Sequence, residues 1–342
     1  MLTIKDIARM CNVSPATVSN VMNGKTNKVS EETRALILKT IEESGYKPNF
    51  IAKGLRSSKT KLIGVIAEDL SLFNMPPIIT GITQYCEERG YMFLLENLRL
   101  YHRWNGTWFN DNEKYDSVFN PAIAEMDAIN VDGIIYVAGH TRSITSLHQD
   151  AKRPVVMAYS ASADPEIPAY VIDDTKAAYD MTNYLISCGH KKIGVIGGER
   201  NNDHSLLRTD GYHKAMFENG LLYDPEIVTY GPWTRENGYE QAGQLIEKGV
   251  TAIFCFADYI AGGVYDYLDE HGLKAGKDIC VAGFDDHEFS HYMSPSLTTV
   301  ALPTIEIGYE SAKRLVSMIE GTDNNQIIEN KMPCTLIKGK SA

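Results

Sequence analysis

The sequence of 342 residues lacks any run of about 18 or more apolar residues, the length that a membrane-spanning helix requires. Its first residues, MLTIKDIARM, are interrupted by Lys5, Asp6 and Arg9, so they lack the apolar core of a secretory signal. The composition, 44% hydrophobic and 23% charged, excludes a disordered chain, a collagen or a coiled coil as a description of the whole. The length favours roughly two or three folding units.

Closely spaced cysteines and common enzyme motifs are absent as well. The six cysteines are scattered and none forms a CxxC pair, which excludes a zinc finger or a redox dithiol centre. A chain of this length does not need disulfides, so we expect reduced thiols and a cytoplasmic protein. No Walker A or GxSxG motif occurs, and the glycines within 194–198 do not match GxGxxG. We therefore expect no cofactor, no metal ion and no enzyme activity.

Charge is present, but it is unevenly distributed. Residues 1–61 carry 11 Lys and Arg against 5 Asp and Glu, a net charge of +6; subtracting this from the chain's −11 leaves −17 for residues 62–342. Such asymmetry indicates a nucleic-acid-binding head on an acidic body, because the head attracts phosphates and the body repels them. Charge alone is equally compatible with a solvated basic face.

The basic segment is predicted to fold as three short helices. Thr3 is a candidate N-cap for the first helix. Ser14 is the N-cap of a second helix over 15–22, where Pro15 suits the first helical position. Ser30 begins a third helix. Two short helices joined by a tight turn form a helix-turn-helix, whose second helix enters the major groove, although a generic three-helix bundle has the same spacing.

Residues 48–56 have the composition of a short helix that forms on DNA. Asn49 can cap a helix of about two turns, which is marginally stable in water, so we expect the segment to be loosely held when free. Ala52 and Leu55 are apolar, and Arg56 follows them. An apolar side chain on a cationic helix is suited to wedging a base step from the minor groove. Leu55 is the predicted wedge.

After residue 62, apolar strands alternate with helical stretches. Strands are predicted over 62–67, 91–96, 132–137 and 154–158, and a second series over 193–196, 252–256 and 279–283, with helices over 77–89 and 211–219 among them. This alternation implies right-handed βαβ units and parallel sheets, hence an α/β fold. Two series imply two lobes, with a ligand bound near the carboxyl ends of the strands.

Several motifs distributed over the chain point to one family. The head and hinge contain TIKDIA, NVSPATVSNVMNG, VSEETR, GYKPNFIAKGL and KLIGVI, and the body contains CGHKKIGVIGG, RTDGY at 208–212, VAGFDD at 281–286 and PSLTTV at 295–300. These motifs resemble those of the LacI/GalR family of bacterial transcription regulators. The resemblance implies a homodimer that binds a near-palindromic operator, a body with the periplasmic-binding-protein fold, and allosteric control by a small-molecule effector held between two lobes.

The resemblance also implies a domain organisation. It predicts a DNA-binding head over 1–47, a hinge helix and linker over 48–61, an N-terminal lobe from 62–160 with 291–323, and a C-terminal lobe from 161–290 with 324–342. The chain thus crosses between the lobes near residues 160, 291 and 323. The expected DNA-binding residues are Thr3, Ser14, Pro15, Ala16, Thr17, Ser19, Asn20, Asn23, Asn49, Ala52, Leu55 and Arg56. Asn can pair bidentately with adenine, and Ala16 is expected to make an apolar contact.

A sugar-like effector needs groups that recognise hydroxyls and an aromatic face for its ring. Arg208, Asp285 and Trp233 offer these chemistries, and the resemblance implies that all three align with effector-contacting positions. Singly, each has an ordinary structural explanation: a charge at a helix N-terminus, a turn after a strand, and a core aromatic. Further expected contacts are Glu68, Asp69, Leu72, Phe73 and Tyr159.

Two residues depart from the family pattern and leave the effector open. Glu68 stands where many relatives carry a small hydroxyl residue, and Ala257 stands where Asn is common. A sugar or sugar derivative is favoured, with a purine as the alternative. Residues 97–120 are longer than the family's usual connection, and we interpret them as a surface insertion rather than as an extension that reaches the cleft or the dimer face.

Two other functional readings compete with a DNA-binding repressor of a carbohydrate-utilisation operon. His287 and His291 fall in an HExxH pattern, which zinc proteases place on one helix face, but Pro295 follows closely and no further His lies downstream. A zinc hydrolase is therefore disfavoured. A solute- or sugar-binding sensor without DNA work explains residues 62–342, but it leaves the basic head without a role.

Overall fold

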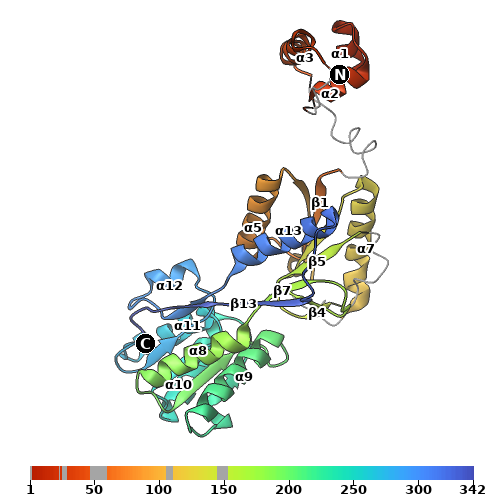
Figure 1. Cartoon of the computed structure of the whole chain (residues 1–342). Coiled ribbons are helices and arrows are strands. Elements are labelled where there is room, and N and C mark those ends of the chain that lie inside the picture. The colour runs from red at the N-terminus through yellow and green to blue at the C-terminus, as the bar shows by residue number, and fades with distance from the viewer. Residues whose placement is uncertain (1, 23, 25–28, 47–59, 105–110, 145–152) are drawn as a thin grey trace. The chain divides into compact units, whose positions relative to one another are not determined.

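The computed structural model describes residues 2–22, 24, 29–46, 60–104, 111–144 and 153–342 (Figure 1). The chain forms two compact units, Met1–Lys61 and Leu62–Ala342. Among the residues described, no helix combines the length and apolar character needed to cross a bilayer.

The described residues of the first unit form three helices, as predicted. Its helices are α1 (Ile4–Met10), α2 (Pro15–Met22) and α3 (Glu31–Ser44). The Thr3 backbone N–H donates to Asp6 Oδ2 (2.9 Å) before α1, and Ser14 Oγ accepts the Thr17 N–H (3.1 Å) at the start of α2. These caps satisfy backbone groups that the first helical turn leaves unpaired. The buried core of the head consists of Ile7, Ala8, Cys11, Val18, Val21 and Ile37.

The N-terminal lobe of the second unit is built on a parallel sheet of six strands. Their order is β13-β7-β5-β3-β1-β2. The strands are β1 (Leu62–Ala67), β2 (Met92–Asn97), β3 (Ile134–Val137), β5 (Val155–Ala158), β7 (Ala169–Ile172) and β13 (Glu329–Met332). Helices α5 (Met75–Arg89) and α13 (Thr304–Glu320) cover one face, and α6 (Leu100–Trp104) and α7 (Asn112–Ile129) cover the other.

The C-terminal lobe repeats this layering on a smaller scale. Its parallel sheet has the order β11-β10-β8-β9, from β8 (Ile193–Gly197), β9 (Val228–Tyr230), β10 (Ala252–Cys255) and β11 (Cys280–Ala282). One face carries α8 (Asp174–Ser187) and α9 (Asp203–Glu218), and the other carries α10 (Arg235–Glu247) and α11 (Asp258–Glu270). The predicted α/β class with a three-helix head and a two-lobed body is confirmed.

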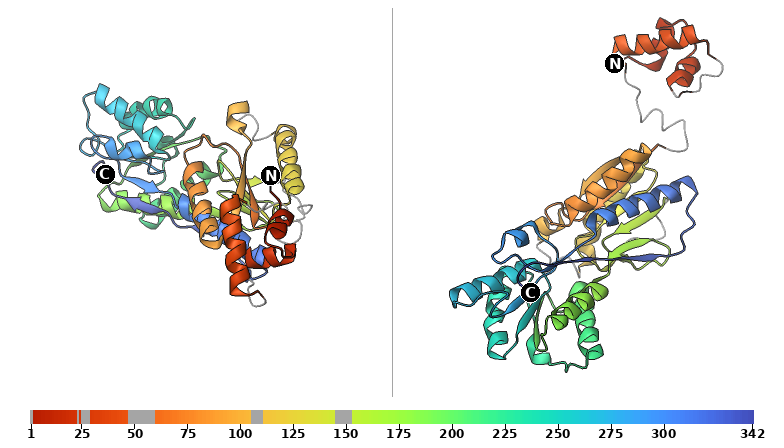
Figure 2. Two further views of the ribbon diagram at one scale, coloured as in Figure 1. Left: turned by 90° about the horizontal axis from the view of Figure 1, so that it is seen from above. Right: turned by 60° about the vertical axis from the view of Figure 1, so that its left-hand side comes forward.

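The chain passes between the lobes three times (Figure 2). The passages follow β7, separate β12 (Thr299–Ala301) from α13, and separate β13 from β14 (Thr335–Ile337). The predicted crossings near 160, 291 and 323 all come too early in the chain. The reason is that β7 and β13 still pair within the six-stranded sheet, while β12 pairs antiparallel with β14. The alternation of strands and helices in the sequence does not predict this pairing.

Residues 97–120 are not a plain surface insertion, contrary to the prediction. Their described part contributes α6 and the start of α7. Leu100, Tyr115 and Phe119 are buried and pack with Ile66 and Tyr136 of the sheet. The segment therefore forms part of the core of the N-terminal lobe, because apolar side chains at helical spacing cover the open face of the sheet.

Candidate DNA interface and effector site

Helix α2 presents a face of small or polar side chains opposite its core-facing residues. Val18 and Val21 are buried in the head, whereas Pro15, Ala16 and Asn20 are exposed. Thr17 and Ser19 are half-buried, and Ser14 is committed to capping α2 through Thr17. Thr3 is exposed at the start of α1. The predicted contacts Asn23, Asn49, Ala52, Leu55 and Arg56 lie outside the described residues.

Glu68, at the end of β1, is fully buried and uses both carboxylate oxygens inside the N-terminal lobe. Oε1 accepts the Tyr136 hydroxyl (2.7 Å) and forms an ion pair with Arg142, and Oε2 accepts the Gly139 N–H (2.6 Å). Burial, with the nearby Glu68 charge, raises the pKa of Tyr136 well above its usual value. Glu68 thus connects the loop after β3 to the end of β1. Its buried negative charge is paired with Arg142, and a buried charge is costly unless it is paired.

The other residues predicted in the loop after β1 differ in where their side chains lie. Asp69 accepts the Ser71 hydroxyl (2.7 Å) and the His102 N–H (3.1 Å). Burial acts against ionisation, but these hydrogen bonds hold the pKa of Asp69 below its usual value. Leu72 is half-buried, and Phe73 is exposed except where its ring lies 4.3 Å from the ring of His287 in the C-terminal lobe. Phe73 is therefore the predicted loop residue that reaches the other lobe.

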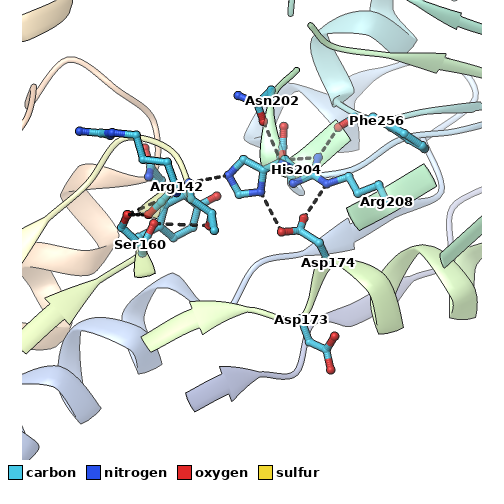
Figure 3. A network of polar contacts seen from close by, with 12 residues as sticks. Arg142, Ser160, Asp173, Asp174, Asn202, His204, Arg208 and Phe256 are labelled. Carbon is cyan, nitrogen blue, oxygen red and sulfur yellow. Dashed lines mark hydrogen bonds and ion pairs between the residues drawn. The ribbon is translucent and has the colours of Figure 1, made fainter. Parts of the chain in front are cut away.

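Arg208 lies inside α9 and not at a helix N-terminus (Figure 3). Its Nε donates to Asp174 Oδ1 (2.7 Å), and its Nη1 donates to the Phe256 carbonyl and lies 3.9 Å from Asp285 Oδ1. The guanidinium also sits 3.6 Å from the centre of the Phe284 ring. A buried arginine requires such a set of acceptors and aromatic faces, so the position of its guanidinium is fixed.

Asp285 follows β11 with a φ of 112°, and its side chain is 8% exposed. Burial raises the pKa of Asp285 well above its usual value, although Arg208 opposes the shift. The oxygens of the Asp285 carboxyl can accept a hydrogen bond from a hydroxyl group.

Trp233 and Tyr159 complete the predicted effector set. The Trp233 ring lies against Gly198, where a Cβ would overlap it, and 5.7 Å from the Arg208 guanidinium. Its buried Nε1 has no hydrogen-bond partner among the residues that the structure describes. Tyr159 follows β5 and is buried; burial and the nearby Asp285 raise its pKa well above its usual value. Arg208, Trp233, Asp285 and Tyr159 thus form one cluster, while Glu68 and Asp69 belong to another.

His204, Asp174 and Arg142 were not among the predicted site residues, and the structure places them at the boundary between the lobes (Figure 3). His204 Nδ1 lies 2.8 Å from Asp174 Oδ2, and His204 Nε2 accepts the Thr141 N–H (3.0 Å) from the N-terminal lobe. His204 precedes Arg208 by one helical turn and shares its helix face, a spacing that could have identified it.

The lobe boundary is packed at this cluster. Asp174, His204 and Arg208 are at most 3% exposed. Two surface hollows lie elsewhere: one of about 850 Å³ between α13 and β13, and one of about 580 Å³ beside Arg200 and Tyr230. In this arrangement of the lobes, Arg208 is buried.

The two histidines of the HExxH pattern have different surroundings. His287 precedes α12 (Glu288–Tyr292), with its ring between Phe73 and Tyr259. His291 lies 3.1 Å from Asp286 Oδ1. Such a short helix does not present both imidazoles to one ion. In the described part of the chain, no group of three or more His, Cys, Asp or Glu is arranged to hold a metal.

Comparisons with known proteins identify the family. The model of bacterial regulatory proteins, lacI family, matches residues 3–49, and a periplasmic binding protein-like domain matches residues 182–342. Catabolite control protein A of Priestia megaterium is 33% identical over 337 residues, covering 96% of each chain. The transcriptional repressor PurR of Haemophilus influenzae is 33% identical over 330 residues, covering 94% of this chain and 93% of PurR.

A solved structure agrees with these relatives. The Lac repressor bound to ONPG in its repressed state matches with a TM-score of 0.79 at 25% identity, covering 100% of this chain and 99% of the repressor. The relatives are regulators of transcription and not enzymes. The chain belongs to the lacI family of bacterial regulatory proteins and is a DNA-binding regulator of transcription.

Proposed function

We propose that the protein is a cytoplasmic repressor of a carbohydrate-utilisation operon. It binds a near-palindromic operator as a homodimer, and an uncharged sugar bound between the lobes changes its affinity for DNA. The observation that supports an uncharged sugar as the effector is that the charges around Arg208 are already paired. A change in lobe angle is transmitted to the two heads, with a coupling free energy of about 1–3 kcal/mol.

The charges at the lobe boundary are already paired. Glu68 neutralises Arg142, and Asp174 neutralises Arg208. Asp285 Oδ1 also lies 3.9 Å from Arg208 Nη1, so two carboxyl groups face this guanidinium. An anionic ligand would bring an unpaired charge into a buried region, which is unfavourable. Hydroxyl groups can instead exchange hydrogen bonds with Arg208 and Asp285, which supports a neutral sugar.

The DNA-binding part of the proposal rests on the exposed face of α2. Pro15, Ala16 and Asn20 face solvent, so two heads related by a two-fold axis can place them in successive major grooves. Asn20 has the amide needed for a bidentate contact with adenine, and Ala16 can contact a thymine methyl group. In the hinge, Leu55 wedges a minor-groove step with Arg56 beside it.

Two experiments on the full chain test the proposal. A thermal-shift screen compares neutral sugars with their phosphorylated counterparts and with nucleobases. We expect at least one neutral sugar to raise the unfolding temperature more than its phosphate, and a response to nucleobases alone would overturn the sugar assignment. A gel shift with promoter fragments, with and without the responding sugar, tests control of DNA binding; operator affinity indifferent to that sugar would overturn the allosteric role.

A further inference from the structure

The hollow of about 580 Å³ on the C-terminal lobe lies outside the residues assigned to the effector so far. Its lining includes Glu199 and Arg200, which follow β8, and Tyr230, Gly231 and Pro232 at the end of β9. Strands β8 and β9 are parallel neighbours, so their carboxyl ends lie at the same edge of the sheet. Ligands of open α/β sheets bind at this edge, so the hollow is in the right place for a binding site.

The hollow adjoins the residues proposed for the effector. Trp233 directly follows the lining residue Pro232, and its ring lies 5.7 Å from the Arg208 guanidinium. In addition, the Tyr230 hydroxyl lies 2.9 Å from Oγ1 of Thr209, the residue after Arg208. A ligand held at Arg208 can therefore extend past Trp233 into the hollow.

The polar groups of the hollow suit hydroxyl groups. Glu199 and Arg200 are exposed, and neither side chain forms an ion pair with another residue that the structure describes. The Arg200 guanidinium lies 5.6 Å from the centre of the Tyr230 ring, a cation–π contact that holds it at the hollow. Arginine donates hydrogen bonds and a carboxylate accepts them, so the two side chains together can bind the hydroxyl groups of a sugar ring. Because their charges are opposite, the hollow favours an uncharged ligand.

Tyr101 of α6 brings the N-terminal lobe close to the same place. The His102 N–H donates to Asp69 Oδ2 (3.1 Å), which fixes α6 at the end of β1. Burial, with the charge of Glu68, raises the pKa of Tyr101 above its usual value, and the charge of Glu199 adds to this shift. Exposed charges more than about 10 Å away are largely screened, so Tyr101 lies near Glu199 across the lobe boundary.

From these contacts we propose that the hollow is a second sugar subsite, and that the effector is a disaccharide or longer sugar. Its first ring binds at Arg208 and its second ring binds at Arg200 and Glu199. This inference rests on the proposed function, because it extends the same effector site. Arg208 is buried, so a ligand longer than one ring needs a way to the surface, which the hollow provides. A volume of about 580 Å³ falls within the range of small-molecule sites, roughly 300–1,000 Å³.

Two variants and a control separate this subsite from the site at Arg208. Arg200→Met removes the guanidinium and keeps an apolar side chain beside Tyr230. Glu199→Gln removes the charge but keeps an oxygen that accepts hydrogen bonds. Lys277→Met is the matched control for Arg200→Met, because it removes one positive charge from an exposed turn of the same lobe that does not line the hollow.

The measurement is isothermal titration calorimetry of the full chain with monosaccharides and with disaccharides that contain them. The pairs are glucose with maltose and with cellobiose, galactose with lactose, and xylose with xylobiose. We expect at least one disaccharide to bind about tenfold more tightly than its monosaccharide, the factor that one hydrogen bond to a charged group gives.

The variants should act on the second ring alone. Arg200→Met should abolish the tenfold gain and leave the affinity for the monosaccharide within about twofold, since the two ring positions are separate. Glu199→Gln should reduce the gain without abolishing it. Lys277→Met should bind both sugars as the unmodified chain does.

The inference fails if no disaccharide binds more tightly than its monosaccharide, or if the gain persists in Arg200→Met. A gel shift with the operator is a separate readout. Disaccharide binding that depends on Arg200 but leaves operator affinity unchanged would remove the proposed function and keep the subsite. Control of operator binding by a monosaccharide, with no gain from a second ring, would remove the subsite alone. Binding of none of these sugars would count against both.

Discussion

Asp258 makes the stability of the C-terminal lobe depend on pH near neutrality. It occupies the first position of α11, where Oδ1 accepts the Thr299 hydroxyl (2.6 Å) and Oδ2 accepts the His287 N–H (2.8 Å). Burial raises the pKa of Asp258 to about 7, although these two hydrogen bonds oppose the shift, and the charge of Asp286 adds to it.

The direction and the size of this pH dependence follow from the linkage between proton binding and folding. Because the pKa rises from 3.8 to about 7 on folding, the stabilising contribution is complete below about pH 4 and is lost as the pH rises through 7. One pKa unit corresponds to about 1.4 kcal/mol, so the full loss is about 4 kcal/mol by pH 8. Roughly 2–3 kcal/mol of it falls between pH 5 and pH 7.

The test is urea unfolding of the unmodified chain and of Asp258→Asn at pH 5, 6, 7 and 8. The amide can still accept from His287 and can donate to Thr299, but it does not titrate. We expect the variant to gain stability relative to the unmodified chain as the pH rises, by about 2–3 kcal/mol over the range.

A matched control keeps the comparison specific. Asp266 lies on the same helix as Asp258, and Asp266→Asn removes its exposed ion pair with Arg235 of α10. The stability difference between this variant and the unmodified chain should stay under about 1 kcal/mol and flat between pH 5 and pH 8. If the stability difference between the unmodified chain and Asp258→Asn were constant over this range, the carboxyl would not be titrating near neutrality, and the reasoning would be refuted.

Three further predictions concern the effector and DNA. Arg208→Lys should abolish the thermal shift given by the responding sugar and leave operator binding without ligand intact, because a lysine cannot keep Asp174 and Phe256 as partners together; an unchanged shift would contradict the assignment. Leu55→Ala should weaken operator binding by about tenfold in a gel shift without altering the sugar response, and equal operator affinity would refute the wedge. Operator affinity should fall by about a thousandfold or more between 50 and 200 mM salt, and a flat dependence would remove the role of the basic head.

Local signals in the sequence located the head well. Ser14 and Pro15 define the start of α2 because capping and the fixed φ of proline depend on adjacent residues alone. In the body, strands β1, β2, β3, β5, β8, β10 and β11 were predicted, whereas β7, β9, β12, β13 and β14 were missed. Helix α9 was expected over 211–219 but begins at Asp203, since its first turns carry His204 and Arg208, polar residues that are buried by contacts with segments distant in the chain. Their burial comes from tertiary contacts that periodicity does not register.

The candidate site could be predicted only in part, for the same reason. Arg208, Asp285 and Trp233 were named together and lie together. Glu68 was expected to face the effector. Its ion-pair partner Arg142 lies on a loop distant in the chain, and no local sequence pattern predicts that a buried carboxylate will be paired. In the structure Glu68 binds Gly139 and Arg142 of the loop that carries Thr141, and its contact with an effector stays a prediction.

The Arg208 cluster lies where a change in the hydrogen-bond partners of Arg208 can affect the segments that connect the two lobes. Asp174 begins α8 directly after the first passage between the lobes. The Asp285 N–H donates to Val300 O of β12, just before the second passage, and Cys334 at the third lies close enough that its pKa responds, after burial, to the charge of Asp174. Under the proposed function, a ligand that draws Arg208 away from Asp174 would act on the three segments that connect the lobes. Small shifts at such segments would become rigid rotations of the packed lobes, since close-packed cores do not deform gradually.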